Sequence, residues 1–149
     1  MINDILIIDG RPKTWEEALE YTYNALREHG YVKKSFLSAC IEREKKFPTG
    51  LPTKIGVAIP HTDAKHVITP AICVLRLGKP VLFQDMGDLD NTVKVHFVFN
   101  MALKDNNDQL PMLRSIISIV QNSRFLRRSK RKPADRLRNE LMEIWCNGE

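Results

Sequence analysis

The chain has 149 residues, of which 43% are hydrophobic and 28% charged, as expected for one globular domain that buries its own core. No apolar run approaches the roughly 18 residues of a membrane-spanning helix, and the N-terminus lacks the features of a secretory signal. The net charge of +5 is concentrated in residues 124–138, where eight basic residues and one acid leave the rest of the chain slightly acidic.

The first half of the chain predicts one strand and two helices. Residues 5–8 form an apolar run that Asp9-Gly10 ends, which indicates a strand. A capping box at Thr14–Glu17 predicts a helix that runs to about Gly30, and residues 33–46 predict a second helix, capped near Ser35. Two prolines and two glycines predict that residues 47–56 are a loop.

The second half predicts further strands followed by helices. Residues 56–60 are a buried strand stopped by Pro60, residues 71–77 form an apolar central strand, and residues 92–100 alternate with a period of two. A helix should follow a cap at Asn107 or Asp108. The last helix should begin at Pro133, end before Asn147-Gly148, and bury one side that consists of Leu137, Leu141, Ile144 and Trp145. This interleaving favours an α/β (α+β) class, a single domain with a mixed sheet covered by helices.

The basic segment at 124–138 has two interpretations. It could bind nucleic acid or anionic lipid, or it could be a solvated, charged connection between helices. Phe125 is its sole aromatic residue, which weakens the case for single-stranded nucleic acid. We therefore favour the solvated connection.

Several kinds of catalytic site find no support in the sequence. Cys40, Cys73 and Cys146 have no metal-ligand spacing and indicate reduced thiols in a cytoplasmic protein, and no cysteine lies near His61 and His66 to complete a zinc site. Neither a G-x-S-x-G nucleophile elbow nor a glycine-rich phosphate loop is present. We expect neither a metal nor another cofactor.

His61 remains as a possible nucleophile. It follows Pro60 directly at the end of a hydrophobic strand, and the proline fixes φ and can turn the chain out of the sheet. A neutral imidazole is nucleophilic near neutral pH, because its unperturbed pKa is roughly 6.5. A histidine in this position could carry a phosphoryl group, although a structural role is also common for a histidine at a strand end.

The local sequence favours the carrier interpretation. The motif "GVAIPH", with "ERE" about eighteen residues upstream, resembles the mannitol/fructose-type enzyme IIA family of the bacterial sugar phosphotransferase system. The longer segment "EREKKFPTGLPTKIGVAIPHTDAKHV" is most similar to the galactitol-type branch, and "PVLFQDMG" and "VKVHFVFNMAL" continue the resemblance. It extends over nearly the whole chain, so residues 1–149 would form one IIA domain.

The resemblance implies a fold, a reaction and partners. The fold would be a mixed sheet of about five strands with helices on both faces. His61 would accept a phosphoryl group from the histidine phosphocarrier protein and pass it to a cysteine of a IIB protein, which serves a membrane-embedded IIC protein. The transported compound would be a sugar alcohol such as galactitol.

The resemblance also implies roles for individual residues. Arg43 matches the active-site arginine of the family, and its planar fork suits phosphate oxygens; a surface pair with Glu42 or Glu44 is the alternative. Thr62, Asp63 and His66 could support the site. Gln109 stands where the mannitol-type branch has a second histidine.

Two other functions stay open at this point. The phosphorylation state of His61 could regulate a target instead of feeding transport, or residues 124–138 could bind nucleic acid, although we expect no nucleic-acid partner.

Overall fold

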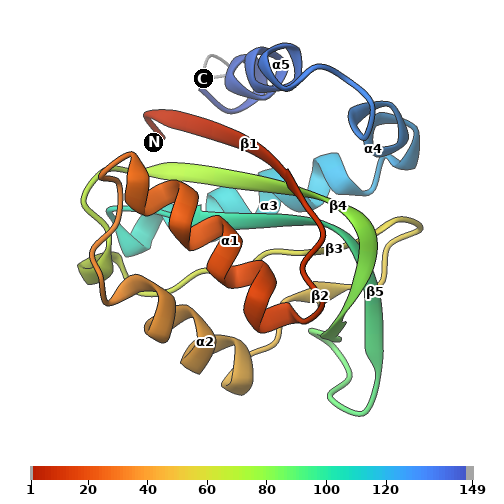
Figure 1. Ribbon diagram of the computed structural model, residues 1–149, viewed down its shortest axis with the longest axis horizontal. Coiled ribbons are helices and arrows are strands. Elements are labelled where there is room, and N and C mark those ends of the chain that lie inside the picture. Colours follow the sequence, from red (N-terminus) through yellow and green to blue (C-terminus); the bar gives the residue numbers. More distant parts are fainter. Residues whose placement is uncertain (1, 147–149) are drawn as a thin grey trace.

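The computed structural model describes residues 2–146 (Figure 1). In chain order these form β1 (Asp4–Gly10), α1 (Trp15–Glu28), α2 (Phe36–Lys46), β2 (Gly50–Leu51), β3 (Gly56–Ala58), β4 (Ala71–Gln84), β5 (Thr92–Ala102), α3 (Gln109–Val120), α4 (Ser123–Ser129) and α5 (Ala134–Cys146), with short 3₁₀ turns η1 (Ala64–His66) and η2 (Asn106–Asp108). The predicted end of the last helix at Asn147-Gly148 lies outside the described residues.

The strands form one five-stranded sheet in the order β1-β4-β5-β3-β2. β1 runs parallel to β4 and β3 parallel to β5, whereas β4–β5 and β2–β3 are antiparallel. The long β4–β5 pair curves through the centre of the molecule, with β1 along one side (Figure 1). The predicted mixed sheet of about five strands is confirmed.

Helices cover both faces of this sheet, as predicted. On one face, α1 and α2 pack Leu19, Leu26, Phe36 and Cys40 against Ala71 and Cys73 of β4 and Ala102 of β5. On the other face, α3, α4 and α5 pack against Val57, Val74, Phe97 and Phe99, and contribute Ile116, Val120, Leu126, Leu137, Leu141 and Trp145. Burying apolar side chains on both faces explains why the central strands are apolar along almost their whole length.

The structure differs from the sequence prediction at three places. β4 continues past Leu77 to Gln84 through a register irregularity opposite β5, where a strand over 71–77 was predicted. Gly50–Leu51, predicted as loop, pairs with β3; a Cβ on Gly50 would lie 2.5 Å from the Gln84 carbonyl oxygen, so only glycine allows this approach. Ile144 is 47% exposed, because the buried stripe of α5 repeats every four residues at Leu137, Leu141 and Trp145.

The helix starts follow the sequence only in part. Thr14 Oγ1 accepts a hydrogen bond from the Glu17 amide at 3.1 Å, as the capping box predicts. Ser35 precedes α2 but makes no side-chain capping bond. None of the helices within residues 2–146 has the length and apolar character needed to cross a bilayer.

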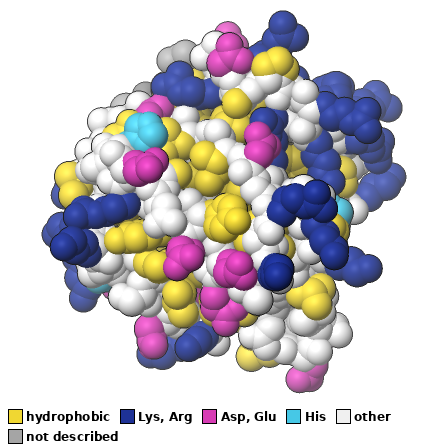
Figure 2. Space-filling view, viewed as in Figure 1, with side chains coloured by type: hydrophobic (Ala, Val, Ile, Leu, Met, Phe, Trp, Pro, Cys, Tyr) yellow, Lys and Arg dark blue, Asp and Glu magenta, His cyan; other side chains and the backbone are white. Residues whose placement is uncertain are grey.

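The basic segment at 124–138 covers most of α4, the turn that follows it and the first turn of α5. Of its eight basic residues, Lys132 pairs with Glu140 and Arg138 pairs with Asp4. The other six are exposed, namely Arg124, Arg127, Arg128, Lys130, Arg131 and Arg136. Lys and Arg side chains accordingly crowd the side of Figure 2 where α4 lies in Figure 1. This arrangement agrees with a solvated, charged connection.

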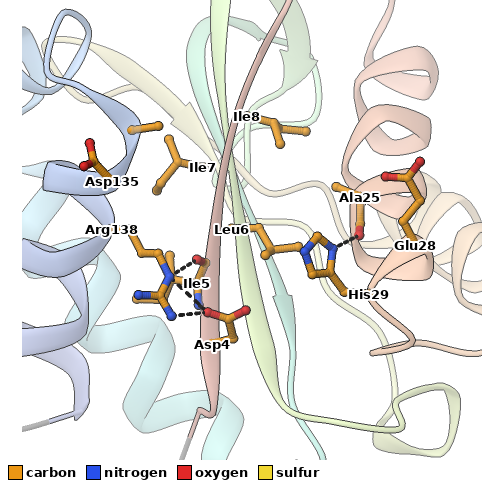
Figure 3. Close-up of a pocket in the computed structure, with 11 residues that line it drawn as sticks. Asp4, Ile5, Leu6, Ile7, Ile8, Ala25, Glu28, His29, Asp135 and Arg138 are labelled. Atoms are coloured by element: carbon orange, nitrogen blue, oxygen red, sulfur yellow. Dashed lines mark hydrogen bonds and ion pairs between the residues drawn. The ribbon is translucent and has the colours of Figure 1, made fainter.

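A cavity of about 400 Å³ runs along β1 between α1 and α5 (Figure 3). Its polar side chains bind one another or the backbone: Arg138 donates to the Asp4 carboxylate and to the Ile5 carbonyl, and His29 Nδ1 contacts the Ala25 carbonyl at 2.9 Å. Arg138 thus holds α5 to the edge strand and His29 closes the end of α1, and we do not assign chemistry to this cavity.

Candidate functional site

His61 lies three residues beyond the end of β3, where the chain leaves the sheet. The Pro60 carbonyl accepts a hydrogen bond from Met101 N at 3.0 Å, which keeps this segment beside β5. The regular pairing of β3 with β5 ends at Ala58, Pro60 has no amide hydrogen to continue it, and an isolated bridge then pairs His61 with Met101. The His61 ring is half-buried, and its Nδ1 lies 3.0 Å from the Ile59 carbonyl oxygen.

That contact fixes the tautomer of a neutral His61 ring. A carbonyl oxygen only accepts hydrogen bonds, so Nδ1 must carry the hydrogen and Nε2 holds the lone pair. Burial lowers the pKa of His61 below its ordinary value; the bond to Ile59 opposes this shift, and the charge of Arg43 adds to it. The ring is therefore predominantly neutral at neutral pH, with an unprotonated Nε2.

Arg43 lies in the last turn of α2 and lines the same cavity as His61. Its guanidinium carbon lies 5.4 Å from the centre of the Phe47 ring, a cation–π contact that holds the side chain. Within residues 2–146, Arg43 forms no ion pair with Glu42 or Glu44, and its buried Nε has no hydrogen-bond partner. The alternative that the sequence left open, an ion pair of Arg43 with Glu42 or Glu44 on the helix surface, is therefore absent among the described residues.

The cavity has a volume of about 490 Å³ and a mainly apolar rim. His61, Arg43, Lys46 and Thr49 contribute its polar groups, and Phe47, Pro48, Met86, Leu89 and Leu113 contribute apolar surface. Phe47 and Leu89 are 63% and 60% exposed, which is unusual for large apolar side chains. The sequence analysis did not identify these residues, because they lie in segments that resemble ordinary loops.

The loop after His61 is held by the start of α3. Gln109 Nε2 donates to the Thr62 carbonyl at 2.8 Å, and Asn106 Oδ1 accepts from the Ala64 amide at 3.0 Å. Thr62 is buried and Asp63 is exposed. Gln109 thus supports the loop that carries His61, with one amide hydrogen engaged on Thr62.

His66 is not brought to His61. Its Nδ1 lies 2.7 Å from Ser35 Oγ at the start of α2, whereas Arg43 lies in the last turn of that helix. Eight residues of helix separate the two ends, or about 12 Å of axial rise. His66 therefore joins the loop to α2 instead of facing the cavity.

Glu44 is a buried carboxylate that the sequence analysis did not assign to the site. It is 5% exposed and accepts hydrogen bonds from both the amide and the hydroxyl of Thr49. Burial raises its pKa to about 7, although the bonds from Thr49 oppose the shift. Its place in the highly charged string "EREKK" gave no sign of burial.

The described residues contain no group of three or more His, Cys, Asp or Glu side chains arranged to hold a metal ion. The groups that His61 and Arg43 present are instead suited to an anion: a neutral imidazole nitrogen and a guanidinium with donors to spare.

Comparisons with known proteins give a consistent result. Residues 2–142 match the family described as phosphoenolpyruvate-dependent sugar phosphotransferase system, EIIA 2. The galactitol-specific EIIA component of Escherichia coli (strain K12) is 35% identical over 106 residues, which cover 70% of each chain. The mannitol-specific phosphotransferase enzyme IIA component of Bacillus subtilis (strain 168) is 32% identical over 116 residues, covering 76% of this chain and 75% of that one.

A solved structure shares the fold. The complex of enzyme IIAMTL and phosphorylated enzyme IIBMTL from Escherichia coli contains a chain that superposes with a TM-score of 0.67 at 22% identity. The match covers 95% of this chain and 92% of that one.

Proposed function

Since this chain belongs to the EIIA 2 family of the phosphoenolpyruvate-dependent sugar phosphotransferase system, we propose that it carries a phosphoryl group on His61. EIIA components are phosphotransferase components. The donor is the histidine phosphocarrier protein, and the acceptor is a cysteine of a cognate IIB protein. Residues 1–149 act as one domain in the cytoplasm, where both partners can reach it.

One observation carries this proposal, namely the state of the His61 ring. Nδ1 is committed to the Ile59 carbonyl at 3.0 Å, so the neutral ring offers Nε2 as its nucleophile. Burial keeps the ring neutral by lowering its pKa. A guanidinium with an unpartnered Nε lines the same cavity.

The phosphoryl transfer needs no cofactor, because every bond that forms is matched by one that breaks. The Nε2 lone pair of His61 attacks the phosphorus in line, the phosphorus–nitrogen bond of the donor breaks, and its electron pair returns to the donor ring. The proton on Nδ1 stays in place, so the phosphorylated ring becomes cationic and its hydrogen bond to the Ile59 carbonyl is strengthened by charge. A thiolate of IIB then attacks the same phosphorus, the bond between phosphorus and Nε2 breaks, and its electron pair returns to the His61 ring, which becomes neutral again.

Arg43 stabilises the negative charge on the phosphoryl oxygens during both transfers. Its donors have no carboxylate partner among the described residues, so they are available without first breaking an ion pair. The exposed apolar rim around His61, which includes Phe47, Met86 and Leu89, would bury against each partner and exclude water from the transfer.

The substrate of the associated transporter is a sugar alcohol such as galactitol. The 35% identity to a galactitol-specific EIIA component supports this choice over other sugars. A IIC membrane partner follows from the same system.

The proposal is tested by phosphoryl labelling. The protein, incubated with phosphoenolpyruvate and the general phosphotransferase proteins, should acquire an acid-labile, base-stable phosphate. His61→Ala should abolish the label, and His29→Ala, at an exposed histidine in the cavity along β1, should not. Labelling of the His61→Ala protein at the wild-type level would contradict the proposal.

A second measurement separates transport from regulation. The labelled protein should pass its phosphate to a purified galactitol-type IIB domain within the mixing time of a manual assay. Stable label with no transfer to any IIB domain would favour the regulatory alternative.

A further inference from the structure

A continuous chain of buried hydrogen bonds joins α2 to the His61 ring. The Glu44 carboxylate accepts from Thr49 N at 2.7 Å and from Thr49 Oγ1 at 2.9 Å. Thr49 Oγ1 accepts from Ile59 N at 3.1 Å, and the Ile59 carbonyl accepts from His61 Nδ1 at 3.0 Å. Glu44, Thr49 and Ile59 are all buried.

For the ionised form of Glu44, the direction of each bond in this chain is determined. An ionised carboxylate only accepts hydrogen bonds, so the Thr49 hydroxyl donates its single hydrogen to Glu44. The Thr49 oxygen is then free to accept from the Ile59 amide. Glu44 therefore decides which way the Thr49 hydroxyl points, and the hydroxyl in turn holds the Ile59 amide.

Thr49 holds the Ile59 amide through two acceptors, its hydroxyl oxygen at 3.1 Å and, at a longer 3.3 Å, its backbone carbonyl oxygen. The pairing of β2 with β3 ends at Gly50 and Ala58, one residue before Ile59. The next residue, Pro60, has no amide hydrogen to anchor. The amide and the carbonyl of Ile59 flank a single Cα, so fixing the amide through Thr49 limits where the carbonyl can point.

We propose that Glu44 and Thr49 are positioning residues that hold the Ile59 carbonyl against Nδ1 of His61 and thereby keep Nε2 as the unprotonated nitrogen. The inference rests on the proposed phosphoryl transfer at His61. The position of the ring proton, however, can be measured by nitrogen NMR on the free protein without any transfer.

The main test is Thr49→Val, with Thr53→Val as its matched control. Thr53 lies in the same loop and donates its hydroxyl to the Ile55 carbonyl at 2.8 Å, but it has no bond to the chain that leads to His61. Thr49→Val should reduce the fraction of neutral His61 that carries its proton on Nδ1. It should also slow phosphorylation by the phosphorylated histidine phosphocarrier protein about tenfold or more, since misplaced reacting groups cost rate steeply.

The control should lose stability while the tautomer of His61 and the phosphorylation rate stay at wild-type values. Thr49→Ser, which keeps the hydroxyl, should restore both readouts. Glu44→Gln should give an intermediate loss in both, because a Gln side-chain oxygen can still accept from the Thr49 amide but its NH₂ group cannot accept from the hydroxyl.

The inference is overturned if folded Thr49→Val keeps the wild-type tautomer and rate. If Thr49→Val does not fold, the decision passes to Glu44→Gln, where wild-type values in both readouts overturn it. If wild-type protein takes no phosphate while Thr49→Val still shifts the tautomer, the proposed function fails and the positioning role of Thr49 stands.

Discussion

The buried carboxylate of Glu44 makes the stability of this protein depend on pH in a direction opposite to that of most carboxylates. Burial raises the pKa of Glu44 to about 7 in the folded protein, compared with about 4.5 for an ordinary glutamate side chain. The folded state therefore binds this proton more tightly than the unfolded state, and its contribution to stability is full below pH 4.5 and lost as the pH rises through 7. Replacement by Gln removes the titration and keeps the size of the side chain.

The free energy of unfolding of Glu44→Gln, relative to wild type, should accordingly rise with pH. At 1.36 kcal/mol per pKa unit, the relative gain between pH 5 and pH 8 is roughly 2–3 kcal/mol. Urea unfolding of both proteins at pH 5, 6, 7 and 8 measures it. Glu42→Gln, at an exposed neighbour on the same helix, is the control and should show no such trend. If the difference in free energy of unfolding between Glu44→Gln and wild type did not change with pH, the bonds from Thr49 would fully offset the effect of burial on the pKa of Glu44.

Three further results are expected at the site. Arg43→Lys keeps the charge but loses the planar fork, so phosphoryl transfer measured by rapid quench should slow about ten- to a thousandfold, with thermal unfolding little changed; a wild-type rate would make Arg43 a surface residue. Gln109→Ala should slow transfer less than Arg43→Lys does, because the bond from Gln109 to the Thr62 carbonyl supports the loop without touching Nε2. In an NMR titration, the His61 ring should show a midpoint below its ordinary value of about 6.5, as its lowered pKa requires; a midpoint above that value would contradict this.

Much of the fold was predictable because its determinants are local or periodic. Thr14 caps α1 as its sequence context predicts, and the period of two over residues 92–100 corresponds to β5. The two-residue strand β2 was not predictable, since it has no periodicity and depends on the close approach of Gly50 to Gln84. The exposure of Ile144 depends on the phase of the buried stripe on α5, which hydrophobicity alone does not fix.

From the sequence, only those site residues could be predicted that belong to a recognisable family motif. The resemblance selected His61 and Arg43, and both line one cavity in the structure, while their chemical roles remain predictions. His66 is only five residues from His61 in sequence, yet its ring bonds to Ser35 at the start of α2. The burial of Glu44 could not be deduced, because a carboxylate between basic residues gives no sign that the fold buries it.

Few positive charges surround His61, and the proposed role as a phosphoryl carrier would benefit from this. Arg43 and Lys46 are the two cationic side chains that line the cavity, and Lys46 is exposed, so water and salt screen its charge. Gln109 is uncharged and already donates to the Thr62 carbonyl, so it adds no positive charge where the resemblance would place a second histidine. Under the proposed transfer, Arg43 would therefore supply most of the stabilisation of the transferring phosphoryl group. A site with several buried cations would stabilise the phosphorylated histidine as well as the transition state, and would slow the onward transfer to a thiol. If His61 carries the phosphoryl group as proposed, a single half-buried guanidinium above Phe47 would lower the barrier in both directions and leave the phosphoryl group free to move on.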